Sequence, residues 1–252
     1  MQRLKDLIQS AGTVLAFTGA GVSTLSGIRD FRGRNGFYNS QWEGIEVEDI
    51  LSIDLFDRDP ATFYRWAREF VYCLDRYQPS AVHLVLSELE RKGYLKGIYT
   101  QNIDMLHQKA GSGAVWELHG SPSRHYCRTC KRVYSYNDVA PTVLSGKLPF
   151  CSVCGTVVKP SIVLYGETLD TQLVDQAYRD MAKADVLLVL GSSLTVQPAA
   201  SLPMAAYYHG GKIVIINAQP TSMDRYAKLR YDDLQTVFDA LLPWAIGLEP
   251  KV

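Results

Sequence analysis

The chain has 252 residues, of which 47% are hydrophobic, and its 26 lysine and arginine residues balance 26 aspartate and glutamate residues. This composition is ordinary for a folded globular protein, and the balanced charge gives no reason to expect nonspecific binding to nucleic acid. No apolar run approaches the roughly 18 residues that cross a bilayer, and the first residues lack the apolar core of a signal peptide. We therefore expect a cytoplasmic protein with reduced thiols, built as one large domain or as a domain with an insertion.

The predicted elements begin with a helix over residues 1–12 and a buried strand over 14–17. Residues 33–79 carry no strong strand signal and favour a small helical module, with 63–70 as one of its helices. A helix over 80–92 has an apolar side wide enough to pack on a sheet. The remaining expected elements are strands over 97–100, 114–118, 161–165, 186–190 and 213–216, and helices over 198–208 and 234–246.

Strands that alternate with helices predict an α/β fold with a parallel, doubly wound, Rossmann-like sheet covered on both faces. Ligands of such sheets bind outside the carboxyl ends of the strands. Five of the predicted strands end in small or polar residues, which are the Gly19 turn, residues 101–104, His119, Ser192 with Ser193, and Asn217. Because these ends meet at one edge, the pattern predicts a nucleotide site there.

The turn after the first strand has the composition of a phosphate-binding turn. Gly19 and Gly21 allow a tight turn and a close approach to a ligand, and Ser23 and Thr24 can cap a helix whose N-terminus faces a phosphate. The usual dinucleotide fingerprint is incomplete, because Thr24 occupies its third glycine position and no acidic residue follows a second strand about twenty residues later. Residues 29–33 then predict a loop that covers the ligand. These features do not describe a standard dehydrogenase.

Four cysteines have the spacing of a zinc ribbon. Cys127 and Cys130 form one pair, Cys151 and Cys154 form another, and twenty residues separate the pairs. Reduced thiols at this spacing favour metal binding over disulfides or unliganded thiols. Four protein ligands leave no open coordination position, so the predicted zinc is structural. Cys73 has no partner in the pattern and is expected in a packed core.

The histidines and acids are open to more than one interpretation. A neutral His119 at the ligand edge can act as a general base, and a structural role is the alternative. Asp104 can bind a carboxamide or a ribose, or it can cap a helix. His83 is expected to be structural, and His107 and His209 are expected at the surface or in structural roles.

Several of these motifs occur together in one known family. In chain order they are Gly19–Ser23, Ser26–Gly33, Thr100–Asp104, His119–Gly120, the four cysteines and Gly191–Ser193. The chain resembles the sirtuins, which are NAD-dependent protein deacylases, and is most similar to the compact bacterial and archaeal type. The resemblance covers nearly the whole chain. It implies a Rossmann-like domain over 1–32, 80–121 and 160–252, and a small domain made of the helical module 33–79 and the zinc ribbon 122–159.

The resemblance also implies which residues bind NAD and the acylated peptide between the two domains. The implied NAD-binding residues are Gly19, Ala20, Gly21, Ser23, Thr24, Asp30, Phe31, Arg32, Gln101, Asn102, Ile103, Asp104, His119, Gly191, Ser192, Ser193 and Asn217. The implied peptide-binding residues are Val163, Tyr165, Gly166 and Glu167, with the peptide added as a strand. The implied catalytic residues are His119, as general base, and Asn102, which orders the ribose and a water.

The implied reaction is NAD-dependent deacetylation of acetyl-lysine, with nicotinamide and O-acetyl-ADP-ribose as products. ADP-ribosyl transfer to protein is one alternative, and a non-catalytic module that binds NAD or acyl-lysine is another. Because the chain keeps Asn102, Asp104 and His119, deacylation is favoured. We expect a monomer whose partners are acetylated proteins or peptides, with no direct nucleic-acid or membrane partner.

Three positions depart from the family pattern. Arg29 stands where many sirtuins have proline, which predicts a covering loop that is more mobile before NAD binds. Tyr165 replaces a phenylalanine and adds a hydroxyl to the acyl tunnel. Sirtuins that prefer succinyl groups have an arginine three residues after a tyrosine, whereas Tyr64 is followed at that distance by Ala67. Because a buried carboxylate without a partner is costly, acetyl and longer uncharged acyl groups are expected as substrates.

Overall fold

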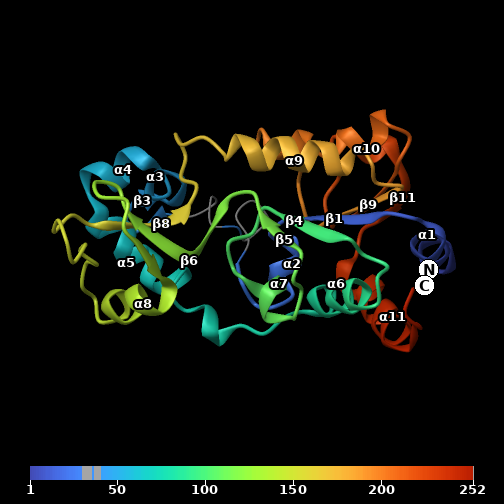
Figure 1. The fold of residues 1–252 in the computed structure, drawn as a ribbon, viewed down its shortest axis with the longest axis horizontal. Helices are drawn as coiled ribbons and strands as arrows, with labels where there is room; N and C mark the ends of the chain where they lie inside the picture. The colour runs from blue at the N-terminus through green and yellow to red at the C-terminus, as the bar shows by residue number, and fades with distance from the viewer. Residues whose placement is uncertain (30–35, 37–40, 252) are drawn as a thin grey trace.

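The protein is described here from a computed structural model, which covers residues 1–29, 36 and 41–251. A six-stranded sheet with helices on both sides occupies one half of the molecule, and a smaller unit with a three-stranded sheet occupies the other (Figure 1). No helix within the described residues is long and apolar enough to span a bilayer.

The large sheet is parallel throughout, as its register pairs show. Its strands, in spatial order, are β11 (Ala227–Tyr231), β10 (Lys212–Ile216), β9 (Val186–Leu190), β1 (Val14–Thr18), β4 (Gly97–Thr100) and β5 (Val115–Glu117). The chain moves outward from β1 through β4 and β5, then crosses to the other side of β1 to form β9. The strand order therefore reverses between β1 and β9, which is the topological switch point of a doubly wound sheet. The predicted fold class is confirmed.

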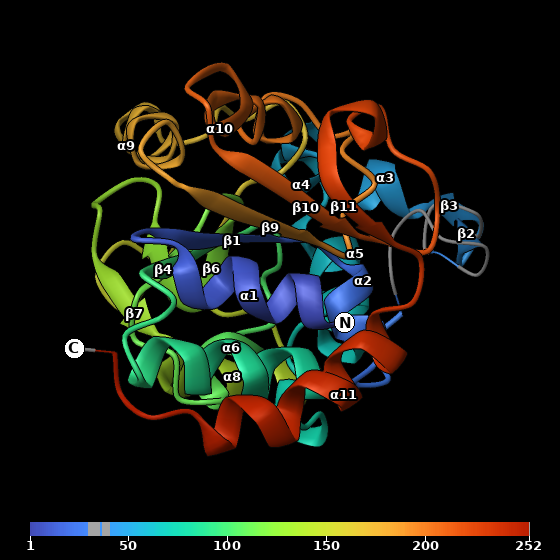
Figure 2. The ribbon, with the colours of Figure 1, turned by 90° about the vertical axis from the view of Figure 1, so that its right-hand side faces the viewer.

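Helices cover both faces of this sheet (Figure 2). One face packs against α1 (Gln2–Ser10), α6 (Ala81–Arg91) and α11 (Leu234–Gly247), and the other against α9 (Thr171–Met181) and α10 (Met204–Tyr208). All five residues of β9 are buried, as expected for a central parallel strand covered on both sides. The short helices α2 (Gly21–Thr24) and α7 (Leu106–Lys109) follow β1 and β4 near the switch point.

The smaller unit has its own core. In its antiparallel sheet, β6 (Gly120–Cys127) lies between β7 (Val133–Ser135) and β8 (Val158–Ile162). Its other elements are the hairpin β2 (Gln41–Trp42) and β3 (Ile45–Glu46), and helices α3 (Val47–Ile50), α4 (Ile53–Arg58), α5 (Pro60–Phe70) and α8 (Tyr136–Leu144). Helix α5 begins cleanly because Asp59 caps it and Pro60 occupies its first turn. Its aromatic residues Phe63, Tyr64 and Trp66 are buried in this core.

Several elements differ from the sequence-based expectation. The strand expected over 161–165 is β8, which ends at Ile162 and pairs antiparallel with β6; Val163 instead donates its backbone N–H to His119 O. The helix expected over 198–208 is split into a 3₁₀ turn, Ala199–Ser201, and α10. Pro203 lies between the two pieces, and proline has no N–H for a continuous helix. The patterns also did not predict α9, β11 or the short hairpin β2–β3.

Candidate active site

The turns after β1 and β9 pack directly against each other at the switch point. Gly21 N donates to Gly191 O over 2.8 Å. A Cβ on Gly191, whose φ is +60°, would lie 2.5 Å from Val22 N, and one on Gly19 would lie 2.8 Å from Gly191 O. These glycines are therefore required for turn-to-turn packing, which is a different reason from the close ligand approach that the sequence suggested.

The amides of α2 also differ from the expectation of several N–H groups aimed at a phosphate. The N–H groups of Val22, Ser23 and Thr24 donate to Gly19 O and Ala20 O within the same turn. Helix α2 has four residues, so its first amides are already used in closing the turn. The turn shapes the cavity wall, and most of the polar groups for a ligand come from other strand ends.

A cavity of about 970 Å³ lies outside the carboxyl ends of the strands, at this switch point. It has the size of a large ligand site. The predicted residues that line it are Ala20, Gly21, Thr24, Gln101, Asn102, Ile103, His119, Val163, Tyr165, Gly166, Glu167, Gly191, Ser192, Ser193 and Asn217. Residues from six distant segments thus meet in one place. Five of them are the strand ends that the sequence predicted, and the sixth is the segment 163–167, which the resemblance implied.

Six predicted residues are not among the described lining of the cavity. Gly19, Ser23 and Asp104 are not part of the lining that is described, and Asp30, Phe31 and Arg32 lie outside the described residues. Sequence reasoning also missed lining residues, among them Leu51, Leu169, Val174, Asp175, Val196–Pro198 and Asp232–Gln235. Residues 232–235 follow β11, so recognising that strand would have placed its end at the same edge.

Asn102 is held by a fixed set of hydrogen bonds. Its Nδ2 donates to Gly19 O and to Ser23 Oγ, each over 3.0 Å, and its backbone N–H donates to Thr100 Oγ1 over 3.0 Å. Both protons of the side-chain amide are thereby used within the protein. The Oδ1 atom is left to accept a hydrogen bond from a hydroxyl or a water at the cavity wall.

Asp104 lies behind Asn102 and is buried. Ser23 Oγ donates to Asp104 Oδ2 over 2.5 Å, and the backbone N–H of Leu106, the first residue of α7, donates to Oδ1 over 2.9 Å. Burial raises the pKa of Asp104, and these two hydrogen bonds act in the opposite direction. Met105 is the N-cap residue of α7, so Asp104 lies just before the cap; its carboxylate holds the first N–H of α7 and supports Ser23.

His119 lies at the end of β5, half-buried in the cavity wall. Its Nδ1 is 2.9 Å from Gln101 O. A carbonyl oxygen only accepts, so this contact assigns the proton to Nδ1 and makes Nε2 the basic nitrogen. Gln101 is fixed in turn, because Ser192 Oγ donates to its Oε1 over 2.8 Å. The ends of β4, β5 and β9 are thus joined by hydrogen bonds around the cavity.

His83 and His107 form a buried pair near the site. Ser80 N donates to His83 Nδ1 over 3.1 Å, His107 Nε2 lies 2.9 Å from Thr18 Oγ1, and the ring centroids are 4.6 Å apart. Burial lowers the pKa of His83 to about 4 and that of His107 to about 3, with the neighbouring His83 adding to the second shift. His83 is structural as expected, and His107 is buried and not at the surface.

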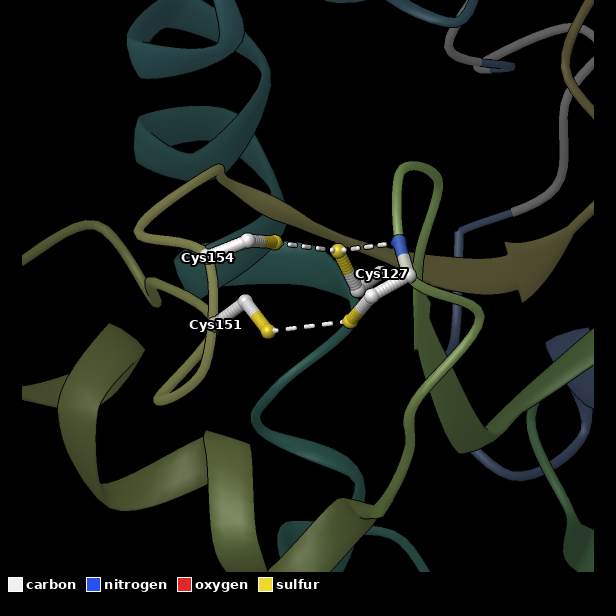
Figure 3. A group of neighbouring side chains, drawn as sticks. Cys127, Cys151 and Cys154 are labelled. Atoms are coloured by element: carbon white, nitrogen blue, oxygen red, sulfur yellow. Dashed lines mark hydrogen bonds between the residues drawn. The ribbon is translucent and has the colours of Figure 1, made fainter.

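The four predicted cysteines meet in the smaller unit (Figure 3). Their sulfur atoms lie within 4.8 Å of one another, with Cys127 Sγ 3.2 Å from Cys154 Sγ and Cys130 Sγ 3.6 Å from Cys151 Sγ. Tetrahedral zinc with Zn–S bonds of about 2.3 Å requires similar separations. The N–H of Cys130 hydrogen-bonds to Cys127 Sγ, and this contact is the main cause that lowers the pKa of Cys127 to about 5. This cluster fits a structural zinc, and none of its residues lines the large cavity.

Comparison with known proteins agrees with this geometry. The profile of the Sir2 family matches residues 19–198. An "NAD-dependent protein deacetylase" of Thermotoga maritima is 40% identical over 232 residues, which cover 92% of this chain and 92% of the relative. An "NAD-dependent protein deacylase 2" of Archaeoglobus fulgidus is 40% identical over 229 residues, which cover 88% of each chain.

Solved structures of similar proteins superpose over nearly the whole chain. A Sir2 with p53 peptide and NAD⁺ has a TM-score of 0.87 at 37% identity, with 97% of this chain and 98% of that chain covered. A Sir2 histidine-to-alanine variant with deacetylated p53 peptide and 3′-O-acetyl ADP-ribose gives 0.89 at 38% identity, with the same coverage. A Sir2 with a propionylated peptide gives 0.86 at 36% identity, again with the same coverage. The chain belongs to the Sir2 family, the sirtuins.

Proposed function

We propose that this protein is an NAD-dependent protein lysine deacetylase, which transfers the acetyl group of acetyl-lysine to ADP-ribose and releases nicotinamide and O-acetyl-ADP-ribose. The observation that carries the proposal is that His119, Asn102 and the segment 163–167 line the same cavity. The curated relatives bear the name of this activity, and related structures contain NAD⁺ with a p53 peptide.

The cavity has the features that NAD requires. It lies at the switch point of the sheet, and the polar groups of Gln101, Asn102, Ser192, Ser193 and Asn217 line it. We assign these residues, with Ala20, Gly21 and Thr24, to holding NAD. When bound, NAD supplies an activated ribose carbon that takes the acyl oxygen as nicotinamide leaves. Asn102 Oδ1 then accepts a hydrogen bond from a ribose hydroxyl or from a water.

His119 is proposed as the general base. Its Nδ1–H is held by Gln101 O, so Nε2 can take a proton from a hydroxyl placed in the cavity. Histidine is the side chain whose ordinary pKa, about 6.5, suits proton transfer near pH 7. The hydrogen bond from Val163 N to His119 O, over 2.8 Å, fixes the proposed peptide-binding segment beside this base.

We propose that residues 163–167 pair with the acylated peptide as an added strand. A related Sir2 was solved with a propionylated peptide, which supports uncharged acyl-lysine as the substrate class. Among the described residues that line the cavity there is no lysine or arginine, whereas Glu167, Asp175, Asp232 and Asp233 are present. An acyl group with its own carboxylate would find no cation in this part of the wall. Tyr64 lies in the core of the smaller unit, where its hydroxyl donates to Val158 O.

The remaining assignments are proposals of the same kind. We assign residues 1–32, 80–121 and 160–252 to the NAD-binding domain, and 33–79 with 122–159 to the small domain. Strands β6 and β8 of the smaller unit cross the boundaries at 121 and 160. We also propose that the protein is a cytoplasmic monomer that acts on acylated proteins without binding nucleic acid. The four thiol ligands, which bind metal when reduced, support the cytoplasmic assignment.

The test is a mass-spectrometric assay of an acetyl-lysine peptide and a matched succinyl-lysine peptide, with and without NAD. Deacetylation that requires NAD and yields nicotinamide and O-acetyl-ADP-ribose in equal amounts is the expected result, with much slower desuccinylation. Transfer of ADP-ribose to protein, with the acetyl group retained, would support ADP-ribosyl transfer instead. Absence of NAD turnover would support the binding module.

A further inference from the structure

Residues 163–167 form a segment that belongs to neither sheet but is tied to both halves of the molecule. At its start, Val163 N donates to His119 O at the end of β5. In its middle, Tyr165 N donates to Leu51 O and Ile53 N donates to Tyr165 O, each over 2.8 Å, which ties it to the turn between α3 and α4. Because all five of its residues line the cavity, the conformation of this segment sets the position of that part of the cavity wall.

A buried lysine contacts the C-terminal residue of this segment and the residue just before the segment. Lys159, on β8, has a side chain that is 1% exposed. Its Nζ donates to Ile162 O over 2.7 Å and to Pro160 O over 3.3 Å, and it lies 2.9 Å from Glu167 Oε2. An ammonium group has three N–H donors, and three oxygen acceptors surround this one. Nζ also lies 5.7 Å from the centroid of the Tyr126 ring, which favours a cation.

Glu167 connects the buried lysine to the backbone of the segment. Glu167 Oε2 accepts a hydrogen bond from the backbone N–H of Leu164 over 2.9 Å and also pairs with Lys159. One carboxylate therefore closes the loop between residues 164 and 167, and the ammonium holds that carboxylate against the end of β8. The NAD-holding strand ends, at Ala20, Ser192 and Asn217, share none of these contacts.

We propose that Lys159 is a positioning residue for peptide binding, because its buried ammonium fixes the shape of residues 163–167. The inference rests on the proposed function. If Lys159 loses its charge, the carbonyl of Ile162 and the carboxylate of Glu167 lose a partner, and the Glu167 side chain can turn to solvent. The segment then no longer presents a fixed edge to the peptide, whereas the NAD contacts are unchanged.

The test compares Lys159→Met with wild type in steady-state deacetylation, with the KM for acetyl-peptide and the KM for NAD measured separately. Loss of a hydrogen-bonded charge pair predicts a rise in peptide KM of about tenfold or more, and a change in NAD KM of less than about twofold. Lys159→Arg keeps the cation and should restore part of the peptide affinity. Lys147→Met removes an exposed lysine of the same unit and is the matched control, with unchanged constants expected.

Glu167→Gln removes the charge of the more exposed partner of the same pair. If Lys159→Met does not fold, the peptide KM of Glu167→Gln replaces it as the test. In a double-mutant cycle, the two substitutions should be less than additive in their effect on peptide KM. The positioning role of Lys159 would be overturned by an unchanged peptide KM, by equal rises in the KM for peptide and the KM for NAD, or by full additivity. None of these results would overturn the proposed function. If wild type neither binds nor deacetylates the peptide, the proposed function fails first, and this inference fails with it.

Discussion

Ser23 Oγ accepts a hydrogen bond from Asn102 Nδ2 over 3.0 Å and donates a hydrogen bond to Asp104 Oδ2 over 2.5 Å. A single hydroxyl thus joins a residue of the cavity wall to a buried carboxylate. Because Asn102 uses both of its amide protons inside the protein, its orientation depends on this chain of bonds. Residues that do not line the cavity therefore determine the position of one that does.

Replacement of Ser23 by alanine should disturb this chain. Ser23→Ala leaves Asn102 and Asp104 each without one partner, at a cost of about 1–3 kcal/mol in unfolding free energy for an unsatisfied buried group. We expect kcat/KM for deacetylation to fall by about 10- to 100-fold, because Asn102 is no longer held in one orientation. Ser26→Ala, in the next turn, removes a buried hydroxyl that has no hydrogen-bond partner among the described residues, and it should change neither quantity. Ser23→Ala activity within twofold of wild type would contradict this account.

Gly191 and Gly210 form a matched pair for the packing of the turns. Both have positive φ, +60° and +89°, but a Cβ on Gly191 would contact Val22 N at 2.5 Å, whereas one on Gly210 would meet no atom of the described residues within 4 Å. Gly210→Ala should show only the backbone strain, about 1–3 kcal/mol. Gly191→Ala should be clearly less stable than that and should weaken NAD binding. Urea unfolding and NAD titration measure both, and equal stability of the two variants would refute the packing role.

The cysteine cluster predicts stoichiometric zinc. Structural zinc contributes about 10–16 kcal/mol in isolated zinc-binding peptides, so its loss should unfold the smaller unit. Cys154→Ser should lower the zinc content measured by elemental analysis and the temperature of unfolding. Cys73→Ser lies outside the cluster and should keep its zinc. Full zinc content in the Cys154 variant would exclude this ligand set.

The buried histidines predict a stability that falls in acid. Their pKa values in the folded protein, about 4 for His83 and about 3 for His107, are below the unfolded value of about 6.5. The unfolded chain therefore binds more protons as pH falls through 6.5, and stability is lost from there towards pH 4. The free energy of unfolding therefore has a positive slope against pH in this range. His107→Gln should reduce that slope by about 1.4 kcal/mol per pH unit, measured by urea unfolding between pH 4.5 and 7. His209→Gln, at an exposed position, is the control, and an identical slope in both variants would contradict the assignment.

The sequence was most informative where burial and chemistry are local. Strands β4 and β9 were predicted with the bounds that the structure gives, since continuous apolar runs mark buried parallel strands. The cysteine spacing predicted the cluster for a similar reason, because two ligands of each pair lie on one short turn. The polar ends of these strands then indicated the edge at which the cavity forms.

The missed features depend on contacts between distant segments. Strand β11 is at the edge of the sheet and only partly buried, so its residues, Ala227–Tyr231, lack an apolar run. Strands β6 and β8 carry polar residues and form a small antiparallel sheet. A lysine is expected at the surface from sequence alone, and the burial of Lys159 becomes visible only with its contact to Glu167, eight positions later. The buried His107 likewise contacts Thr18, which is 89 positions away in sequence.

In the proposed reaction, His119 is the general base for NAD-dependent deacetylation in this cavity. The most direct measurement follows the rate of acetyl-peptide deacetylation at saturating NAD for wild type and for His119→Ala. Loss of a general base predicts a fall in kcat of about 10²- to 10⁴-fold, with NAD binding and thermal stability nearly unchanged. Deacetylation by the variant at the wild-type rate would contradict the account, because the nitrogen assigned to take the proton would then not be needed.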